Sequence, residues 1–83
     1  GLYDLSGSLG IPGQLDHPKV IQARNKILDA CMKKNILAGI HILYPDKNLF
    51  RQVVKEGFKF IAYGGDIIYL GESCKKSLKE INV

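Results

Sequence analysis

The sequence predicts an α/β domain, and three observations lead to this class. Residues 16–35, 45–57 and 67–81 place apolar side chains at helical spacing. Residues 36–44 and 58–63 are short, nearly continuous apolar runs, which are typical of parallel strands covered on both faces. The two kinds of segment alternate, so the predicted order is loop, helix, strand, helix, strand, helix, with a right-handed βαβ crossover at the centre.

The first helix is expected to begin at Asp16, because aspartate is a good N-cap residue. Pro18 then falls in the first turn, where its missing N–H group is not needed. The helix is predicted to close at residues 33–35. Its helical stripe consists of Val20, Ala23, Arg24, Ile27, Leu28 and Cys31.

The second helix is predicted to open at Pro45-Asp46 and to stop at Gly57, a suitable residue for a left-handed C-terminal position. The third helix is expected to start after Asp66, which we interpret as its N-cap. Gly64-Gly65 before it could form a phosphate-binding nest, but the negative charge of Asp66 argues against an anion there. The apolar stripe of the third helix consists of Ile67, Leu70, Cys74, Leu78 and Ile81.

Two parallel strands and three helices are too few to make a self-sufficient fold. Both edges of such a sheet are open, and parallel pairs occur almost only inside larger sheets. Residues 1–4 also read as a loop that leaves a strand outside the sequence. We therefore expect residues 1–83 to be a single partial domain, one piece of a larger α/β domain.

Charge and cysteine content exclude several classes of protein. The net charge is +4 in 83 residues, but only two of the basic residues are arginines and no basic segment is interleaved with aromatic side chains, so we predict no nucleic-acid partner. No apolar run approaches the roughly 20 residues of a membrane-spanning helix. Cys31 and Cys74 both lie in helical apolar stripes, so we expect buried, reduced thiols and a cytoplasmic location.

Residues 1–10 carry the most specific pattern, G-L-Y-D-L-S-G-S-L-G. They resemble the G-P-x-D-L-S-x-x-x-G signature of the HpcH/HpaI aldolase and citrate lyase family, with Leu2 in place of the usual proline. Residues 62–66, A-Y-G-G-D, are similar to the family's A-V-G-S-D, with Gly65 in place of serine. Between these two segments the resemblance continues, in order, through Gly13, His17-Pro18, Ala38-Gly39-Ile40 and Gly57-Phe58.

The resemblance implies a fold and a reaction. The family fold is a (β/α)₈ barrel of about 250 residues. This sequence would be its C-terminal third: the loop after strand six, helix six, strand seven, helix seven, strand eight and helix eight. The implied reaction cleaves a 2-oxo-4-hydroxy acid to pyruvate and an aldehyde, or forms it from them, with a divalent ion (Mg²⁺ or Mn²⁺, and Co²⁺ can serve) as Lewis acid.

The resemblance also implies roles for individual residues. Asp4 would be one carboxylate ligand of the metal, and the backbone N–H groups of Tyr3 and Asp4 would hold the pyruvate carboxylate. His41 falls near the end of a strand that would face the barrel mouth, where family members place side chains that contact substrate. The partner glutamate of the metal site, and the arginine and histidine of the family's site, lie upstream in the family and are absent from this sequence.

Simpler interpretations stay open for each of these residues. Asp4 could be a solvated loop acid, His41 a packed histidine with satisfied hydrogen bonds, and His17 a helix-start residue beside Pro18. Ser6 and Ser8 have no histidine and aspartate at a usable spacing for nucleophilic catalysis.

The alternative function for the whole chain is that of a non-catalytic module for oligomerisation. The resemblance implies a homo-oligomer, with the last helix at the interface between subunits.

Overall fold

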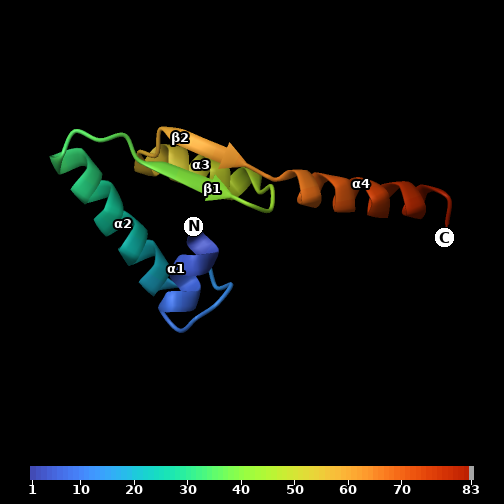
Figure 1. Ribbon diagram of the computed structural model, residues 1–83, viewed down its shortest axis with the longest axis horizontal. Coiled ribbons are helices and arrows are strands. Elements are labelled where there is room, and N and C mark those ends of the chain that lie inside the picture. Colours follow the sequence, from blue (N-terminus) through green and yellow to red (C-terminus); the bar gives the residue numbers. More distant parts are fainter. Residues whose placement is uncertain (83) are drawn as a thin grey trace.

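The computed structural model describes residues 1–82 as an α/β arrangement of short elements (Figure 1). The predicted alternation of helices and strands is confirmed, and one additional helix lies at the N-terminus. The elements are α1 (Leu2–Ser8), α2 (Pro18–Lys33), β1 (Gly39–Ile42), α3 (Lys47–Glu56), β2 (Phe60–Tyr63) and α4 (Asp66–Glu80).

The two strands pair in parallel, as predicted. Gly39 lies opposite Phe60 and His41 lies opposite Ala62, so the strands are in register from end to end. Helix α3 connects them, which makes β1–α3–β2 the predicted crossover unit. The carboxyl ends of both strands therefore meet at one edge of the pair.

The start of α2 differs from the prediction by one residue. The N-cap is His17, not Asp16, and its ring Nδ1 accepts a hydrogen bond of 3.1 Å from the backbone N–H of Lys19. The physical reason is Pro18, which disfavours helical backbone angles in the residue before it. His17 is accordingly extended (φ −64°, ψ 139°), so it is the last non-helical residue and takes the cap. Its interpretation as a helix-start residue is confirmed.

Both ends of α3 are confirmed. The Asp46 carboxylate accepts hydrogen bonds from the N–H groups of Asn48 and Leu49, at 3.0 and 3.1 Å. Gly57 ends the helix with a φ of 119°. The next residue, Phe58, donates its N–H to the Val53 carbonyl at 3.1 Å and is buried, which is the arrangement of a Schellman motif.

The core lies on one face of the strand pair, between the strands and helices α2 and α3. Its buried members are Leu28, Ala38, Ile42, Val53 and Phe58. Helices α2 and α3 pack on the same face, so within residues 1–82 the other face of the strand pair is uncovered. On the uncovered face, Phe60 keeps 77% of its surface exposed.

The prediction of a loop over the first residues is also wrong. Residues Leu2–Ser8 form α1, which packs against α2 and β1. The Ser6 hydroxyl holds this short helix in place, since it donates to the Tyr3 carbonyl at 2.8 Å and accepts from the Gly13 N–H at 3.0 Å. The Ser6 side chain is fully buried, so it is not available as a nucleophile.

Helix α4 projects away from the other elements (Figure 1). Its N-cap is Gly65, not Asp66, which is the first helical residue. None of its residues is buried. Cys74 is therefore exposed, contrary to the prediction, while Cys31 on α2 is only partly buried. Through residue 82, no helix has the length and apolar character needed to cross a membrane.

Candidate active-site edge

The carboxyl ends of β1 and β2 are tied together by a histidine and a glycine. His41 Nε2 lies 2.6 Å from the backbone carbonyl oxygen of Gly64, just beyond the end of β2. The Gly64 N–H donates in turn to the Ile42 carbonyl at 2.7 Å. The backbone bond extends the pairing of the strands by one residue, and together with the His41 bond it fixes the loop that leads into α4.

The loop accepts only glycine at position 64. Gly64 is buried and has a φ of 82°, in the left-handed region that favours glycine. A Cβ atom there would collide with the ring of Tyr69, which lies across the loop. The Tyr69 hydroxyl donates to the Tyr63 carbonyl at 3.0 Å, so α4 is anchored to this loop at its first turn.

His41 lies on the sheet face opposite α3. Ile40 and Ile42 pack toward the core, and side chains alternate along a strand, so His41 points to the uncovered face. The residue is exposed, and Nε2 has a hydrogen-bond partner. The alternative interpretation of His41 as a packed histidine with satisfied hydrogen bonds is wrong in that the residue is exposed and correct in that Nε2 has a partner.

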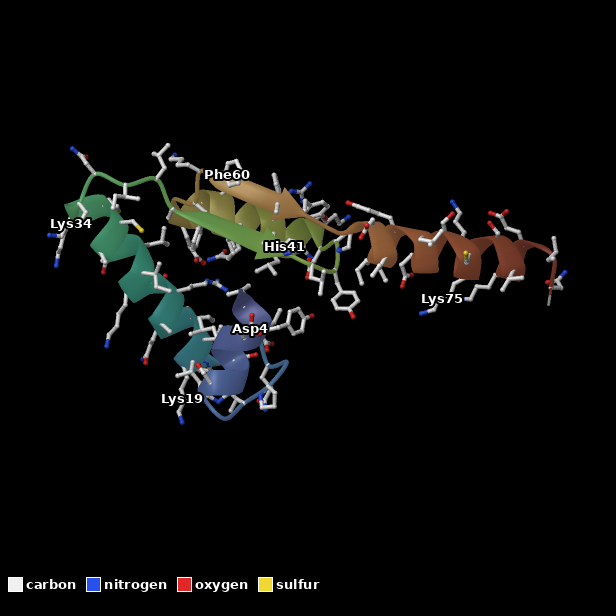
Figure 2. All side chains as sticks on the ribbon, viewed as in Figure 1. Asp4, Lys19, Lys34, His41, Phe60 and Lys75 are labelled. Carbon is white, nitrogen blue, oxygen red and sulfur yellow. The ribbon has the colours of Figure 1, made fainter. Side chains whose placement is uncertain are left out.

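Asp4 is an exposed residue in the first turn of α1, the helix that contacts β1 (Figure 2). Its carboxylate oxygen Oδ2 lies 3.1 Å from the position that a Cβ on Gly1 would occupy, so the carboxylate folds back toward the start of the helix. A negative charge at this end is favoured by the helix dipole. Asp4 is a helix residue, and the expectation of a loop acid is wrong in that respect.

Tyr3 links α1 to the end of β1. Its ring packs edge-on against the ring of Tyr44, with centroids 6.0 Å apart and an interplanar angle of 69°. The first hydrogen bond of the helix is donated by the N–H of Leu5 to the Gly1 carbonyl, at 2.9 Å. The N–H groups of Tyr3 and Asp4 precede that bond, as the first N–H groups of every helix do.

The described side chains do not assemble a metal site by themselves. Within residues 1–82, no group of three or more histidine, cysteine, aspartate or glutamate side chains comes together. Mg²⁺ and Mn²⁺ prefer about six oxygen ligands, of which Asp4 could supply at most two. The side chains present therefore fit part of the ligand set of a metal site and not the complete set.

Three comparisons with known proteins agree with one another. Residues 1–71 match the family model described as HpcH/HpaI aldolase/citrate lyase. This chain belongs to the HpcH/HpaI aldolase/citrate lyase family. The family resemblance drawn from residues 1–10 and 62–66 is thereby confirmed.

Two similar proteins align with most of this chain. A hydroxypyruvate/pyruvate aldolase of Paraburkholderia phytofirmans (strain DSM 17436 / LMG 22146 / PsJN) is 33% identical over 81 residues, 98% of this chain and 30% of that protein. A pyruvate aldolase of Rhizobium etli (strain ATCC 51251 / DSM 11541 / JCM 21823 / NBRC 15573 / CFN 42) is 41% identical over 73 residues, 84% of this chain and 27% of that protein.

A solved structure shows the same agreement in three dimensions. The crystal structure of an HpcH/HpaI aldolase from Desulfitobacterium hafniense DCB-2 matches with a TM-score of 0.88 and 31% identity, over 98% of this chain and 31% of that one. The chain thus spans less than a third of the length of each relative.

The structure of this family member contains one interior ion pair that the sequence analysis missed. Arg24 on α2 donates from Nε and Nη2 to the two carboxylate oxygens of Glu56 at the end of α3, at 2.8 and 2.7 Å. Gln52 adds a bond of 2.8 Å to the same carboxylate. The hydrogen bonds from Arg24 hold the pKa of Glu56 below its ordinary value, against burial, which raises it. An arginine within an otherwise apolar stripe was the signal that could have revealed this pair.

Proposed function

We propose that this chain is the C-terminal third of a (β/α)₈-barrel aldolase, with β1 and β2 as strands seven and eight. The TM-score of 0.88 to an HpcH/HpaI aldolase over nearly the whole chain supports this assignment. So does the placement of α2 and α3 on one face of a parallel pair, because the helices of such a barrel form an outer layer. The uncovered face with His41 and Phe60 would then face the barrel interior.

The reaction we propose is the cleavage or formation of a 2-oxo-4-hydroxy acid, a carbon–carbon lyase reaction. In the cleavage direction the C4 hydroxyl loses its proton to a base, the bond between C3 and C4 breaks, and its electron pair goes to the pyruvate enolate. The aldehyde forms in the same step, and a proton returned to C3 of the enolate gives pyruvate. Pyruvate as one product is supported by the names of both relatives, which are pyruvate aldolases. Active sites of such barrels lie at the carboxyl ends of the strands, the edge that carries His41 and Gly64.

The observation that carries the proposal is the position of the Asp4-Leu5-Ser6 motif. It lies on α1, and α1 contacts β1. We propose that Asp4 supplies one carboxylate to a divalent ion, Mg²⁺, Mn²⁺ or Co²⁺, whose other ligands come from outside residues 1–82. Bound there, the ion would supply positive charge for the enolate. The N–H groups of Tyr3 and Asp4 would bind the pyruvate carboxylate, as donors at the positive end of a helix do.

We also propose a homo-oligomer in which α4 contacts a neighbouring subunit, and a cytoplasmic location. The exposed apolar side chains of α4, such as Ile67 and Leu70, support the first. The two free cysteines, Cys31 and Cys74, support the second. A purely non-catalytic module is the weaker candidate, because both relatives are named as aldolases.

The test of the proposed function is Asp4→Ala in the complete aldolase. Turnover that depends on the metal should fall by about 100-fold or more, since loss of even an outer-shell partner of a metal site costs about 10–100-fold. Mn²⁺ affinity, measured by calorimetry, should fall as well. The matched control is Asp29→Ala, which removes an exposed carboxylate from α2 and should change neither quantity. Normal activity and normal Mn²⁺ affinity in Asp4→Ala would remove Asp4 from the site.

A further inference from the structure

Ser6 is a fully buried polar residue of α1, and its hydroxyl makes two hydrogen bonds. It donates to the Tyr3 carbonyl at 2.8 Å and accepts from the Gly13 N–H at 3.0 Å. A buried hydroxyl is unfavourable without partners, so the two bonds hold this side chain in one place. The side chain is buried by residues 1–82 themselves, so its burial does not depend on the parts of the relatives that this chain does not cover.

The backbone of Ser6 holds the same loop. Its carbonyl accepts from the Ile11 N–H at 3.0 Å, next to the bond from Gly13 to its hydroxyl. The loop can return to the helix because Gly10 and Gly13 have φ values of 79° and 78°, in the left-handed region that favours glycine. Ser6 thus ties α1 to residues 10–13 through both its hydroxyl and its carbonyl.

This tie matters because α1 is not stabilised from within. The helix has 7 residues and no side-chain cap at its start, and helices this short are not stable in isolation. Its position therefore depends on tertiary contacts. The two side chains that it buries are those of Leu2 and Ser6.

The bond from Ser6 to Tyr3 acts on the backbone that carries Asp4. The Tyr3 carbonyl and the Asp4 N–H belong to one planar peptide group, so a bond that fixes the carbonyl fixes the whole plane. Figure 2 shows Asp4 on α1, the helix that Ser6 ties down. An aspartate side chain is short and occupies a few discrete rotamers, so a displacement of α1 would displace the carboxylate with it.

We propose that Ser6 is a positioning residue for the metal site, which holds the Asp4 carboxylate in place for a divalent ion by fixing α1 against residues 10–13. The inference rests on the proposed function and adds to it a residue that contacts neither the ion nor the substrate. Mg²⁺ requires nearly ideal octahedral geometry, so a small displacement of one ligand weakens its binding. Loss of a group that holds a metal ligand in place typically lowers metal affinity by about 10–100-fold.

Ser8 provides an internal comparison. Its hydroxyl donates to the Leu5 carbonyl at 3.0 Å, which is the same local bond, three residues back, that Ser6 makes to Tyr3. Ser8 is exposed, and this bond lies within α1. Ser8→Ala thus removes one local bond of the helix and keeps the tie to residues 10–13.

The experiment measures the Mn²⁺ affinity of the complete aldolase by calorimetry, without substrate, so the readout does not depend on activity. Ser6→Ala should weaken Mn²⁺ binding by about tenfold, and Ser8→Ala should leave it unchanged. Circular dichroism and thermal unfolding show which variants fold. If Ser6→Ala does not fold, Ser6→Cys replaces it, because a thiol occupies a similar space but is a weak donor and a weak acceptor.

A double variant tests whether Ser6 acts through Asp4. Asp4→Ala removes the carboxylate that Ser6 holds in place, so Asp4→Ala combined with Ser6→Ala should bind Mn²⁺ as weakly as Asp4→Ala alone. A further tenfold loss in the double variant would show that Ser6 acts on the site by another route, and would overturn the inference.

The outcomes distinguish this inference from the function on which it rests. A role of Ser6 in stability alone would lower the Tm of Ser6→Ala but leave its Mn²⁺ affinity at the wild-type value. That result, together with weaker binding in Asp4→Ala, would overturn the inference and leave the proposed function intact. Equal losses in Ser6→Ala and Ser8→Ala would also overturn it. Wild-type Mn²⁺ affinity in Asp4→Ala itself would overturn both.

Discussion

Arg24 and Glu56 join two helices that are distant in the sequence. Their side chains keep only 5% and 13% of their surface exposed, and the guanidinium group contacts both carboxylate oxygens. Such a bidentate pair has fixed geometry and strong, charge-assisted hydrogen bonds. Loss of one partner would leave the other charged and poorly solvated. The pair therefore contributes to the position of α2 relative to the end of α3.

The lowered pKa of Glu56 makes this contact sensitive to acid. Because the pKa is lower in the folded chain, the unfolded chain binds more protons as the pH falls. The stabilisation is present above the ordinary glutamate pKa of about 4.3 and is lost as the pH falls through the lower, folded value. At neutral pH, Glu56→Gln should lower the free energy of unfolding by about 3 kcal/mol, because it leaves the buried Arg24 charge without a negatively charged partner.

Urea unfolding at pH 7 and at acidic pH measures both effects. The wild-type protein should lose stability on acidification, and Glu56→Gln should lose less of it. The matched control is Glu72→Gln, which removes the exposed carboxylate that lies 3.7 Å from Lys75 on α4. That substitution should lower the free energy of unfolding by less than about 0.5 kcal/mol, because the pair is exposed. Equal effects of the two substitutions at both pH values would contradict the role given to the interior pair.

At the scale of the elements, the ends of the helices depend on two glycines in different ways. Gly57 has a φ of 119° and ends α3, whereas Gly65 has an extended φ of −171°. A Cβ at position 57 would meet no atom closer than 4.0 Å. A substitution there would therefore lower the stability of the fold through backbone strain and not through a collision. A Cβ at position 65 would make an ordinary contact of 3.6 Å with Leu43.

Gly57→Val should therefore destabilise the fold far more than Gly65→Ser. Valine in a left-handed conformation costs about 1–3 kcal/mol, and β-branched residues are at the upper end because they are outliers there. Serine at position 65 meets neither strain nor a clash, and we expect less than about 0.5 kcal/mol. Thermal unfolding of both variants measures the difference, and equal shifts in Tm would show that α3 does not end where the structure places its boundary.

The elements that the sequence predicted well are those with local signals. Asp46 and Gly57 mark the two ends of α3 through bonds to residues at most four positions away. Helix α1 has no side-chain cap at its start, and part of its support comes from the bond between Ser6 and Gly13, seven residues along the chain. The ion pair of Arg24 and Glu56 spans 32 residues. Arg24 within an apolar stripe indicates a buried partner, but no local pattern identifies that partner as Glu56.

The features of the candidate site also divide into those with a local sequence signal and those that depend on contacts between distant residues. Asp4, Tyr3 and His41 were identified from a motif and from position along a strand. The bond from His41 to Gly64 depends on the register of the two strands, and a shift of one residue would turn the histidine to the other face. The helical spacing of apolar residues in α4 predicts burial whether or not the chain supplies another element to pack against them. It therefore could not show that this apolar stripe is exposed.

At the scale of the whole molecule, the arrangement is extended and leaves much apolar surface exposed. Its dimensions are 53 × 27 × 18 Å, with α4 reaching away from the strand pair (Figure 1). Ile67 on α4 and Leu37 before β1 are more than three-quarters exposed, like Phe60. Exposed apolar side chains of this size favour association when they gather on one face, as they do along an amphipathic helix such as α4. In addition, a pair of strands has two edges with unpaired backbone groups.

These surfaces predict that the 83-residue chain alone associates. Sedimentation over a hundredfold range of concentration should show dimers or larger species, and apparent stability should rise with concentration because association favours the folded form. The caps of α2 and α3 should preserve helical circular dichroism even where tertiary packing is loose.

Two substitutions on α4 identify the surface responsible. Replacing Leu70 and Leu78 with lysine should weaken association by removing apolar side chains that are 69% and 50% exposed, without loss of any buried contact. The matched control is Lys76→Glu, which alters charge on the same helix but no apolar side chain, and association should persist in it. If the double variant associates as the wild type does, the uncovered face of the strand pair, and not α4, makes the contact. A wild-type chain that sediments as a monomer at every concentration and unfolds cooperatively would instead show that these 83 residues form a self-sufficient domain, and would contradict the assignment of β1 and β2 to a larger barrel.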